Sequence, residues 1–364
     1  MKVAYENLPY QHVADSPATK HYANWEVFEE YVARRERASR LGVDAGLLVL
    51  RPDVTLSPGT VGVEDEPSWP LPVDTKLPAF HFSNLASSLS LELSGEKLVV
   101  AVEKPLEGFY SAHLNVRLRG SSSLILVSLA PPEAAGLSTL SLNVSVEEGS
   151  RSRLEVILFD SGSSATALMA VARLGEGSAL QESVVAVSGR ALYADLKASL
   201  RGGGSSLDSS ILAVSPREAH ASLNTDVAVE SPRSSALIRL VGASADGFLA
   251  HKGAVKIVRG SVNARGRLSS RLIPLTPSSK VYASPTLEIE SDDAEEAQHS
   301  ASQSPVDPQR IFYLRSRGFT EQEALRLALK AEAFKAFEGR SPNGYVLFYI
   351  EEALKAALRS VSAG

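Results

Sequence analysis

The sequence predicts a mainly β fold, a parallel β-helix solenoid with a helical region at each end. Three observations lead to it: apolar and polar residues alternate through residues 79–290, glycines interrupt that stretch at nearly even spacing, and helical spacing appears within residues 1–78 and 291–364. Successive side chains of a strand point to opposite faces, so the central stretch buries one face and exposes the other. These three ranges are the predicted domains.

Residues 1–78 are predicted to hold one helix and a proline-rich linker. Asn24 is a suitable N-cap for the segment 25–35, in which apolar residues at 25, 28, 31 and 32 recur at helical spacing. Prolines at 52, 58, 67, 70, 72 and 78 then exclude a long helix. We expect this part to be a linker or an extended segment.

Residues 79–290 are predicted to form the β-helix core. Alternation is clearest at 140–146, where Leu, Leu, Val and Val are separated by polar residues. Glycines stand at 95, 108, 120, 136, 149, 162, 175, 189 and 202, mostly 13 residues apart. A fixed period of short strands and turns is typical of a solenoid, although a regular antiparallel sandwich also fits. About 200 residues of one rhythm favour the solenoid.

Residues 291–364 are predicted to form a helical domain. Thr320 and Glu323 have the spacing of a capping box, and Gly339 is placed to end the helix that follows. A second amphipathic helix begins near Tyr345 and continues to about Leu358. Helices after a solenoid either cover its open strand edge or offer a docking surface.

Composition excludes several functions. The 364 residues carry a net charge of −5, so a nucleic-acid partner is not expected, because phosphate neutralisation needs a surplus of basic residues. No segment resembles a signal peptide or an apolar span of ~20 residues, so we expect a cytoplasmic protein without a membrane partner. The chain has no cysteine, which removes thiolate ligands, thiol nucleophiles and disulfides.

No catalytic constellation stands out from the residues themselves. An acidic run at 288–296 ends near His299, and such a cluster could hold a cation, but on charge alone a solvated loop at the end of the solenoid is the favoured explanation. The sequence has no GxSxG elbow and no HExxH pair. An extended binding surface is the usual role of a solenoid.

The C-terminal third carries several motifs in a definite order. They are PTLEIESDD at 285–293, His299 followed by SAS, and IFYLRSRGFT at 311–320, with the segments 245–248 and 253–257 upstream. In this order and spacing they resemble the SufB/SufD family of the SUF iron–sulfur cluster assembly system. The clearest likeness covers residues 245–337.

The resemblance implies a right-handed β-helix that pairs with a SufB-type paralogue or with a second copy of itself. It also implies that the C-terminal helices bind a SufC-type ABC ATPase, and that a nascent cluster forms between two β-helix subunits. Since no thiolate is available, the chain is similar to SufD, and another subunit must accept sulfur. We therefore expect a non-catalytic scaffold with no tightly bound cofactor and at most a transient iron–sulfur cluster at the shared interface.

The resemblance also indicates candidate site residues. His299 matches a family histidine at the interface and could ligate iron transiently, with Glu295 or Glu296 beside it; His220 lies near another family histidine. Candidate ATPase-docking or core residues of the helical domain are Phe312, Tyr313, Phe334, Phe337, Tyr345 and Phe348. Two alternatives stay open: a β-helix enzyme acting on polysaccharides, and a purely structural solenoid partner with no role toward iron.

Overall fold

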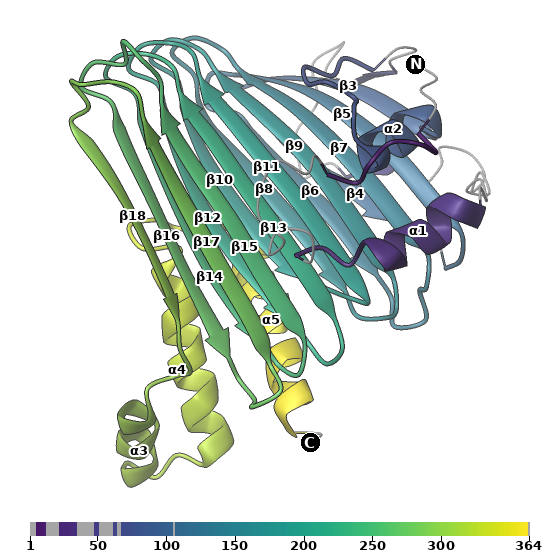
Figure 1. Ribbon diagram of the computed structural model, residues 1–364, viewed down its shortest axis with the longest axis vertical. Helices are drawn as coiled ribbons and strands as arrows, with labels where there is room; N and C mark the ends of the chain where they lie inside the picture. The colour runs from purple at the N-terminus through teal and green to yellow at the C-terminus, as the bar shows by residue number, and fades with distance from the viewer. Residues whose placement is uncertain are drawn as a thin grey trace.

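The fold is a two-sheeted β-solenoid. Figure 1 shows the computed structural model, which describes residues 5–11, 22–34, 47–50, 61–63, 67–104 and 106–362. From β3 to β18 the chain changes sheet after every strand, and neighbouring strands within each sheet are parallel. The two sheets face each other as in a sandwich, but parallel neighbours exclude the antiparallel sandwich. The predicted mainly β solenoid with terminal helices is confirmed.

The strands divide evenly between the two sheets. In order, sheet A contains β1 (Leu47–Leu50), β4 (Lys97–Glu103), β6 (Ser123–Ala130), β8 (Arg151–Asp160), β10 (Ala179–Val187), β12 (Ser206–Ser215), β14 (Ser235–Ser244), β16 (Arg265–Pro274) and β18 (Glu296–Gln303). Sheet B contains β2 (Val61–Val63), β3 (Ser87–Ser94), β5 (Phe109–Arg119), β7 (Leu137–Val146), β9 (Ala165–Leu174), β11 (Ala191–Leu200), β13 (His220–Val229), β15 (Phe248–Ile257) and β17 (Lys280–Ile289). The short β1 and β2 pair antiparallel with β4 and β3, so they end the sheets on the N-terminal side.

The glycine period of the sequence corresponds to half a turn of the solenoid. Leu137 pairs with Ala165 and Ala165 with Ala191, so a full turn takes about twice the 13 residues between glycines. Gly149 adopts a φ of 65°, which favours glycine, and a Cβ at Gly202 would lie 2.0 Å from the main-chain nitrogen of Glu176 in the turn beneath. Turns of stacked strands therefore need glycine for two reasons, backbone conformation and close approach.

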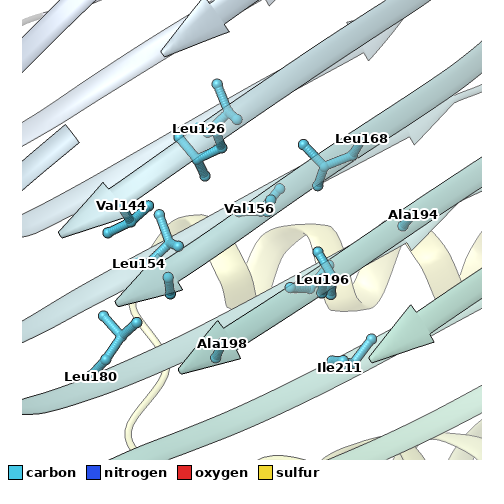
Figure 2. Packing of buried hydrophobic residues seen from close by; sticks show 14 of the residues in the cluster. Leu126, Val144, Leu154, Val156, Leu168, Leu180, Ala194, Leu196, Ala198 and Ile211 are labelled. Carbon is cyan, nitrogen blue, oxygen red and sulfur yellow. The ribbon is translucent and has the colours of Figure 1, made fainter. Parts of the chain in front are cut away.

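Aliphatic side chains fill the space between the sheets. In Figure 2, Leu154 and Val156 of β8 and Leu196 and Ala198 of β11 belong to one buried cluster that runs along the solenoid. In-register parallel strands place side chains of the same face above one another, so each ladder packs on the ladder of the opposite sheet. The alternation in the sequence thus records which face of each strand is internal.

Two N-terminal helices cover the outer face of sheet B. They are α1 (Trp25–Arg34), which confirms the predicted helix, and α2 (Lys76–Ser83), which the sequence did not predict. Pro78 lies in the first turn of α2, where its missing N–H costs nothing. Phe28 and Phe80 pack against Phe109 and other outward residues of sheet B. Of the predicted linker, Pro52 and Pro58 lie outside the described residues.

Three C-terminal helices follow the solenoid, and we call them the handle (α3–α5). They are α3 (Pro308–Ser316), α4 (Glu321–Lys335) and α5 (Gly344–Ser362). Of these, α4 and α5 cover part of the outer face of sheet A, and α3 packs on α4. The predicted capping box of Thr320 and Glu323 is present, whereas α3 was not predicted as a separate helix. α5 crosses β8, β10 and β12, and α4 reaches β14 (Figure 1). The helices therefore lie on the side of the solenoid and leave the free edges of its last strands, β17 and β18, uncovered.

The strand-rich region extends past residue 290, where the sequence placed its end. β18 pairs with β16 through Leu268↔His299, although residues 296–303 show no apolar alternation. An edge strand with one neighbour does not need an apolar face, which is why the pattern gave no signal. None of the helices in the described part of the chain has both the length and the apolar character needed to cross a bilayer.

Candidate functional site

The C-terminal end of the solenoid presents a pair of uncovered strands. β17 is the last strand of sheet B and β18 the last of sheet A, and we call their inner faces the open end. Val281, Ala283 and Leu287 of β17 and Ala297 of β18 are only partly buried against the core. No further rung covers them within the residues that the structure describes, so one edge of each sheet and the end of the aliphatic core face outward.

His299 lies in the middle of β18 at this open end. It pairs with Leu268 of β16, whose side chain is buried in the core, so His299 lies on the inner face of the sheet. Because no strand follows, its side chain is exposed. The Gln303 side chain on the same face reaches the β17 main chain at Ala283, so it joins the two sheets four positions farther along β18 than His299.

Glu295 and Glu296 do not lie beside the His299 side chain, although the sequence suggested that they would. Glu295 is paired with Arg265, and Glu296 with Arg267, both on β16. The Arg265 guanidinium lowers the pKa of the Glu295 carboxyl through a hydrogen bond. Glu296 and His299 are three positions apart on one strand, so their side chains point to opposite faces. The structure thus places these carboxylates outside the solenoid and the imidazole inside.

His220 lies away from the open end, at the start of β13. Its ring stacks on Phe248 with the centroids 4.3 Å apart, and its Nε2 lies 2.7 Å from the main-chain oxygen of Tyr22. Burial lowers its pKa, so the ring is neutral and Nε2–H donates to that carbonyl. In this arrangement His220 attaches an N-terminal segment to sheet B, and the structure does not bring it near His299.

The described residues contain no cluster of three or more His, Cys, Asp or Glu side chains suited to hold a metal ion. A single exposed imidazole at an open end is an incomplete ligand set for an iron–sulfur cluster, whose irons are usually held by several protein ligands. Any cluster that contacts His299 therefore needs further ligands from a second molecule.

The six aromatic residues predicted as docking or core residues of the helical domain fall into two groups by exposure. Phe337 is 2% exposed, and Phe334 packs partly against the same cluster of handle and sheet A residues. The other four are exposed: Phe312 and Tyr313 on α3, at 76% and 55%, and Tyr345 and Phe348 at the start of α5, at 42% and 57%. Only these four are available for a partner.

Charged groups anchor the handle to sheet A. Arg340, whose side chain is 5% exposed, donates from Nε to Asp208 Oδ2 at 3.0 Å and from Nη1 to the main-chain oxygen of Glu182 at 2.5 Å. Arg239 approaches the same Asp208 at 3.0 Å and donates to the main-chain oxygen of Ala336 at 3.1 Å. Sequence reasoning missed these residues, because nothing local links partners 132 positions apart.

A second ionic cluster joins α3, α4 and β16. The Glu332 carboxylate, 8% exposed, lies 2.8 Å from Arg310, 2.8 Å from Lys335 and 3.7 Å from Arg271. Hydrogen bonds and attraction from these cations outweigh burial and lower the pKa of Glu332. The handle is thus tied to the strands next to the open end as well as to the middle of sheet A.

Comparison with known proteins gives a family match. Residues 103–332 match the model of the SUF system iron–sulfur cluster assembly SufBD core domain. A segment of 77 residues is 39% identical to the iron–sulfur cluster assembly protein SufD of Bacillus subtilis (strain 168), and one of 92 residues is 28% identical to SufD of Escherichia coli (strain K12). These segments cover 21% and 25% of this chain, and 17% and 22% of the two relatives.

Proposed function

This chain belongs to the SufBD core-domain family of the SUF system and so has a role in iron–sulfur cluster assembly, from which we infer that it is a non-catalytic, SufD-like scaffold subunit. In this proposal its open end pairs with a second β-helix, either a SufB-type paralogue or a second copy. Its handle binds a SufC-type ABC ATPase. The iron–sulfur cluster is cargo formed at the shared interface rather than a resident cofactor.

The uncovered last rung is the observation that carries the proposal. Exposed strand edges readily pair with strands of another chain, and solenoids normally end in a polar cap. Here both edges stay open beside partly buried aliphatic residues. A second β-helix stacked end to end would continue both sheets and bury these residues, which gives the pairing a hydrophobic driving force.

His299 is well placed for a role at such an interface. Its exposed imidazole lies on the inner face of β18, so a stacked partner would enclose it. Neutral imidazole is a good ligand for iron, and low exposure to water would strengthen that interaction. Because the chain has no cysteine, the partner must supply the thiolates and accept the sulfur.

The handle supports the ATPase part of the proposal. Phe312, Tyr313, Tyr345 and Phe348 leave aromatic surface in water, and aromatic residues are enriched at the centres of protein interfaces. Arg340 and Glu332 fix the handle to the solenoid, so force applied to the helices would reach β16 and the open end. A rigid connection of this kind suits nucleotide-driven movement of one subunit by another.

Cluster formation tests the role of His299. In a reconstituted complex with the ATPase and a SufB-type subunit, we expect His299→Ala to lower cluster yield at least several-fold while the complex remains assembled. The matched control is Gln298→Ala, an adjacent exposed residue on the outer face of the same strand. An unchanged yield with His299→Ala would remove the ligand role and leave the purely structural alternative.

ATPase binding tests the handle. We expect Phe312→Ala with Tyr313→Ala, or Tyr345→Ala with Phe348→Ala, to weaken binding of a SufC-type ATPase by tenfold or more, since truncating interface anchors costs about 2 kcal/mol or more. The two pairs lie on different helices, so comparing the two double variants shows how much each helix contributes to binding. Full affinity in both double variants would exclude these aromatics as the docking surface.

A further inference from the structure

A hollow of about 320 Å³ lies between α4 and the outer face of sheet A. Its walls come from β14, β16, β18 and α4, so it is distinct from the open end and from the exposed aromatic residues of the handle. The charged and polar side chains that line it are those of Arg239, Ser269, Arg271, Ser302, Glu332 and Lys335. Three cations and two hydroxyl groups therefore face one carboxylate.

Cations also outnumber carboxylates in the layer around the hollow. Glu332 is shared by Arg310, Lys335 and Arg271, and Asp208 is shared by Arg239 and Arg340. Among the side chains that line the hollow, the three cations Arg239, Arg271 and Lys335 against the Glu332 carboxylate leave a formal charge of +2, in a chain whose net charge is −5. Glu182 is near Arg340 but does not line the hollow; its carboxyl accepts a hydrogen bond from Ser209.

Arg271 is held in place by groups that do not neutralise it. Its Nη1 lies 2.6 Å from Ser304 Oγ, and its Nη2 lies 3.2 Å from the main-chain oxygen of Pro305. Its nearest carboxylate oxygen, Glu332 Oε2, is 3.7 Å away, too far for a hydrogen bond, while the other oxygen of that carboxylate, Oε1, accepts from Arg310 and Lys335 at 2.8 Å. The guanidinium is therefore oriented beforehand and keeps charge available for an added anion.

We propose that this hollow binds a phosphate group. Arg271, Lys335 and Arg239 supply charge-assisted donors, and Ser269 and Ser302 supply hydroxyl donors, which is the donor set that phosphate oxygens prefer. A doubly charged anion offsets the surplus of cations and outweighs the repulsion from Glu332. The volume exceeds that of inorganic phosphate alone, so a phosphate carried by a small organic molecule also fits.

Binding is tested by calorimetric titration of the full-length protein in low-salt buffer without phosphate. One arm uses inorganic phosphate and the other AMP, which separates free phosphate from a nucleotide source. We expect saturable one-site binding in at least one arm and a matching rise in the unfolding temperature. Arg271→Gln and Lys335→Gln should each weaken binding about tenfold, as expected for loss of one charge-assisted contact.

Lys355→Gln is the matched control. Lys335 and Lys355 each pair with a glutamate three positions earlier on a handle helix, and both are about half exposed, but only Lys335 lines the hollow. If Arg271→Gln disturbs the fold, as judged by circular dichroism, Lys335→Gln alone decides the question. The proposal would be overturned if neither phosphate nor AMP bound at concentrations up to 10 mM. It would also be overturned if Lys335→Gln and Lys355→Gln bound the ligand with equal affinity.

Discussion

The two helical covers of the solenoid differ in what they leave exposed. On sheet B, α1 and α2 bury Phe28 and Phe80 completely. On sheet A, the handle packs mostly through aliphatic residues and alanines, and every exposed aromatic residue in the described part of the chain lies between Phe312 and Phe348. The aromatic residues of α1 and α2 pack internally and stabilise the fold. Several aromatic residues of the handle are exposed to water, as expected for a surface that binds a partner.

The polar contacts of the two covers also differ. On sheet B, His81 of α2 lies 2.9 Å from Thr139 Oγ1 and 2.7 Å from Ser141 Oγ, a neutral and fully buried contact. On sheet A the contact is a charged pair between the buried guanidinium of Arg340 and the partly exposed carboxylate of Asp208. The N-terminal cover should therefore respond to pH, and the handle should respond to loss of its ion pair.

The largest expected effect contrasts two phenylalanines. Phe80→Ala should lower the free energy of unfolding by about 3–5 kcal/mol, because it leaves a cavity among buried aromatic rings. Phe312→Ala should change it by less than about 0.5 kcal/mol, since that ring is exposed. Urea denaturation followed by circular dichroism measures both. Similar losses in the two variants would show that the covers do not differ as described.

The second contrast compares two arginines that attach a cover to a sheet. Arg340→Ala should cost about 2–3 kcal/mol, because it removes the charge-assisted bonds that a buried guanidinium makes to Asp208 and to the main-chain oxygen of Glu182. Arg190→Ala should cost at most about 1 kcal/mol, because the pair of Arg190 with Glu30 of α1 is largely exposed.

Hydrogen exchange distinguishes the two arginine variants locally. Arg340→Ala should reduce protection of the first turns of α5, whereas Arg190→Ala should leave α5 unchanged. Equal protection of α5 in both proteins would mean that apolar packing alone holds the handle.

The third and smallest effect is a pH dependence from His81. Burial lowers the pKa of His81 to about 3, against an ordinary value near 6.5. Between these values the unfolded chain binds more protons, so stability falls as the pH decreases from about 6.5 toward 3. By pH 5 this one group should cost about 2 kcal/mol relative to pH 7.

His81→Asn should remove that part of the slope when unfolding is measured at pH 7 and pH 5. His251, buried between the sheets with its pKa lowered to about 4, adds a slope of the same sign in both proteins and cancels in the comparison. Parallel pH profiles of the two proteins would exclude His81 as the responsible group.

The sequence predicted those helices and strands that are marked by a local pattern, such as alternation or a capping box. Alternation at 140–146 predicted β7, and the Thr320–Glu323 capping box predicted the start of α4. α2 and α3 were missed because short helices depend on the surface they cover. β18 was missed because an edge strand lacks the apolar alternation of the core strands.

The candidate site was predicted only in part. Position in the chain singled out His299 together with Glu295 and Glu296, but strand geometry places Glu296 on the face opposite the histidine. The six aromatic residues were likewise one group in the sequence, and packing divided them into buried Phe337, partly buried Phe334 and four exposed residues. Spacing in the sequence shows which face a side chain occupies only when the strand and its register are known.

By itself, the sequence determined the half-turn period, the internal face of most strands and the absence of any thiolate, since each depends on residue type and local spacing. Tertiary structure decided which end of the solenoid stays open, which helices cover which sheet, and how Arg340 and Asp208 meet across 132 positions. These features depend on contacts between segments far apart in the sequence. Such contacts form, and stabilise the protein, only when the chain has folded into the solenoid.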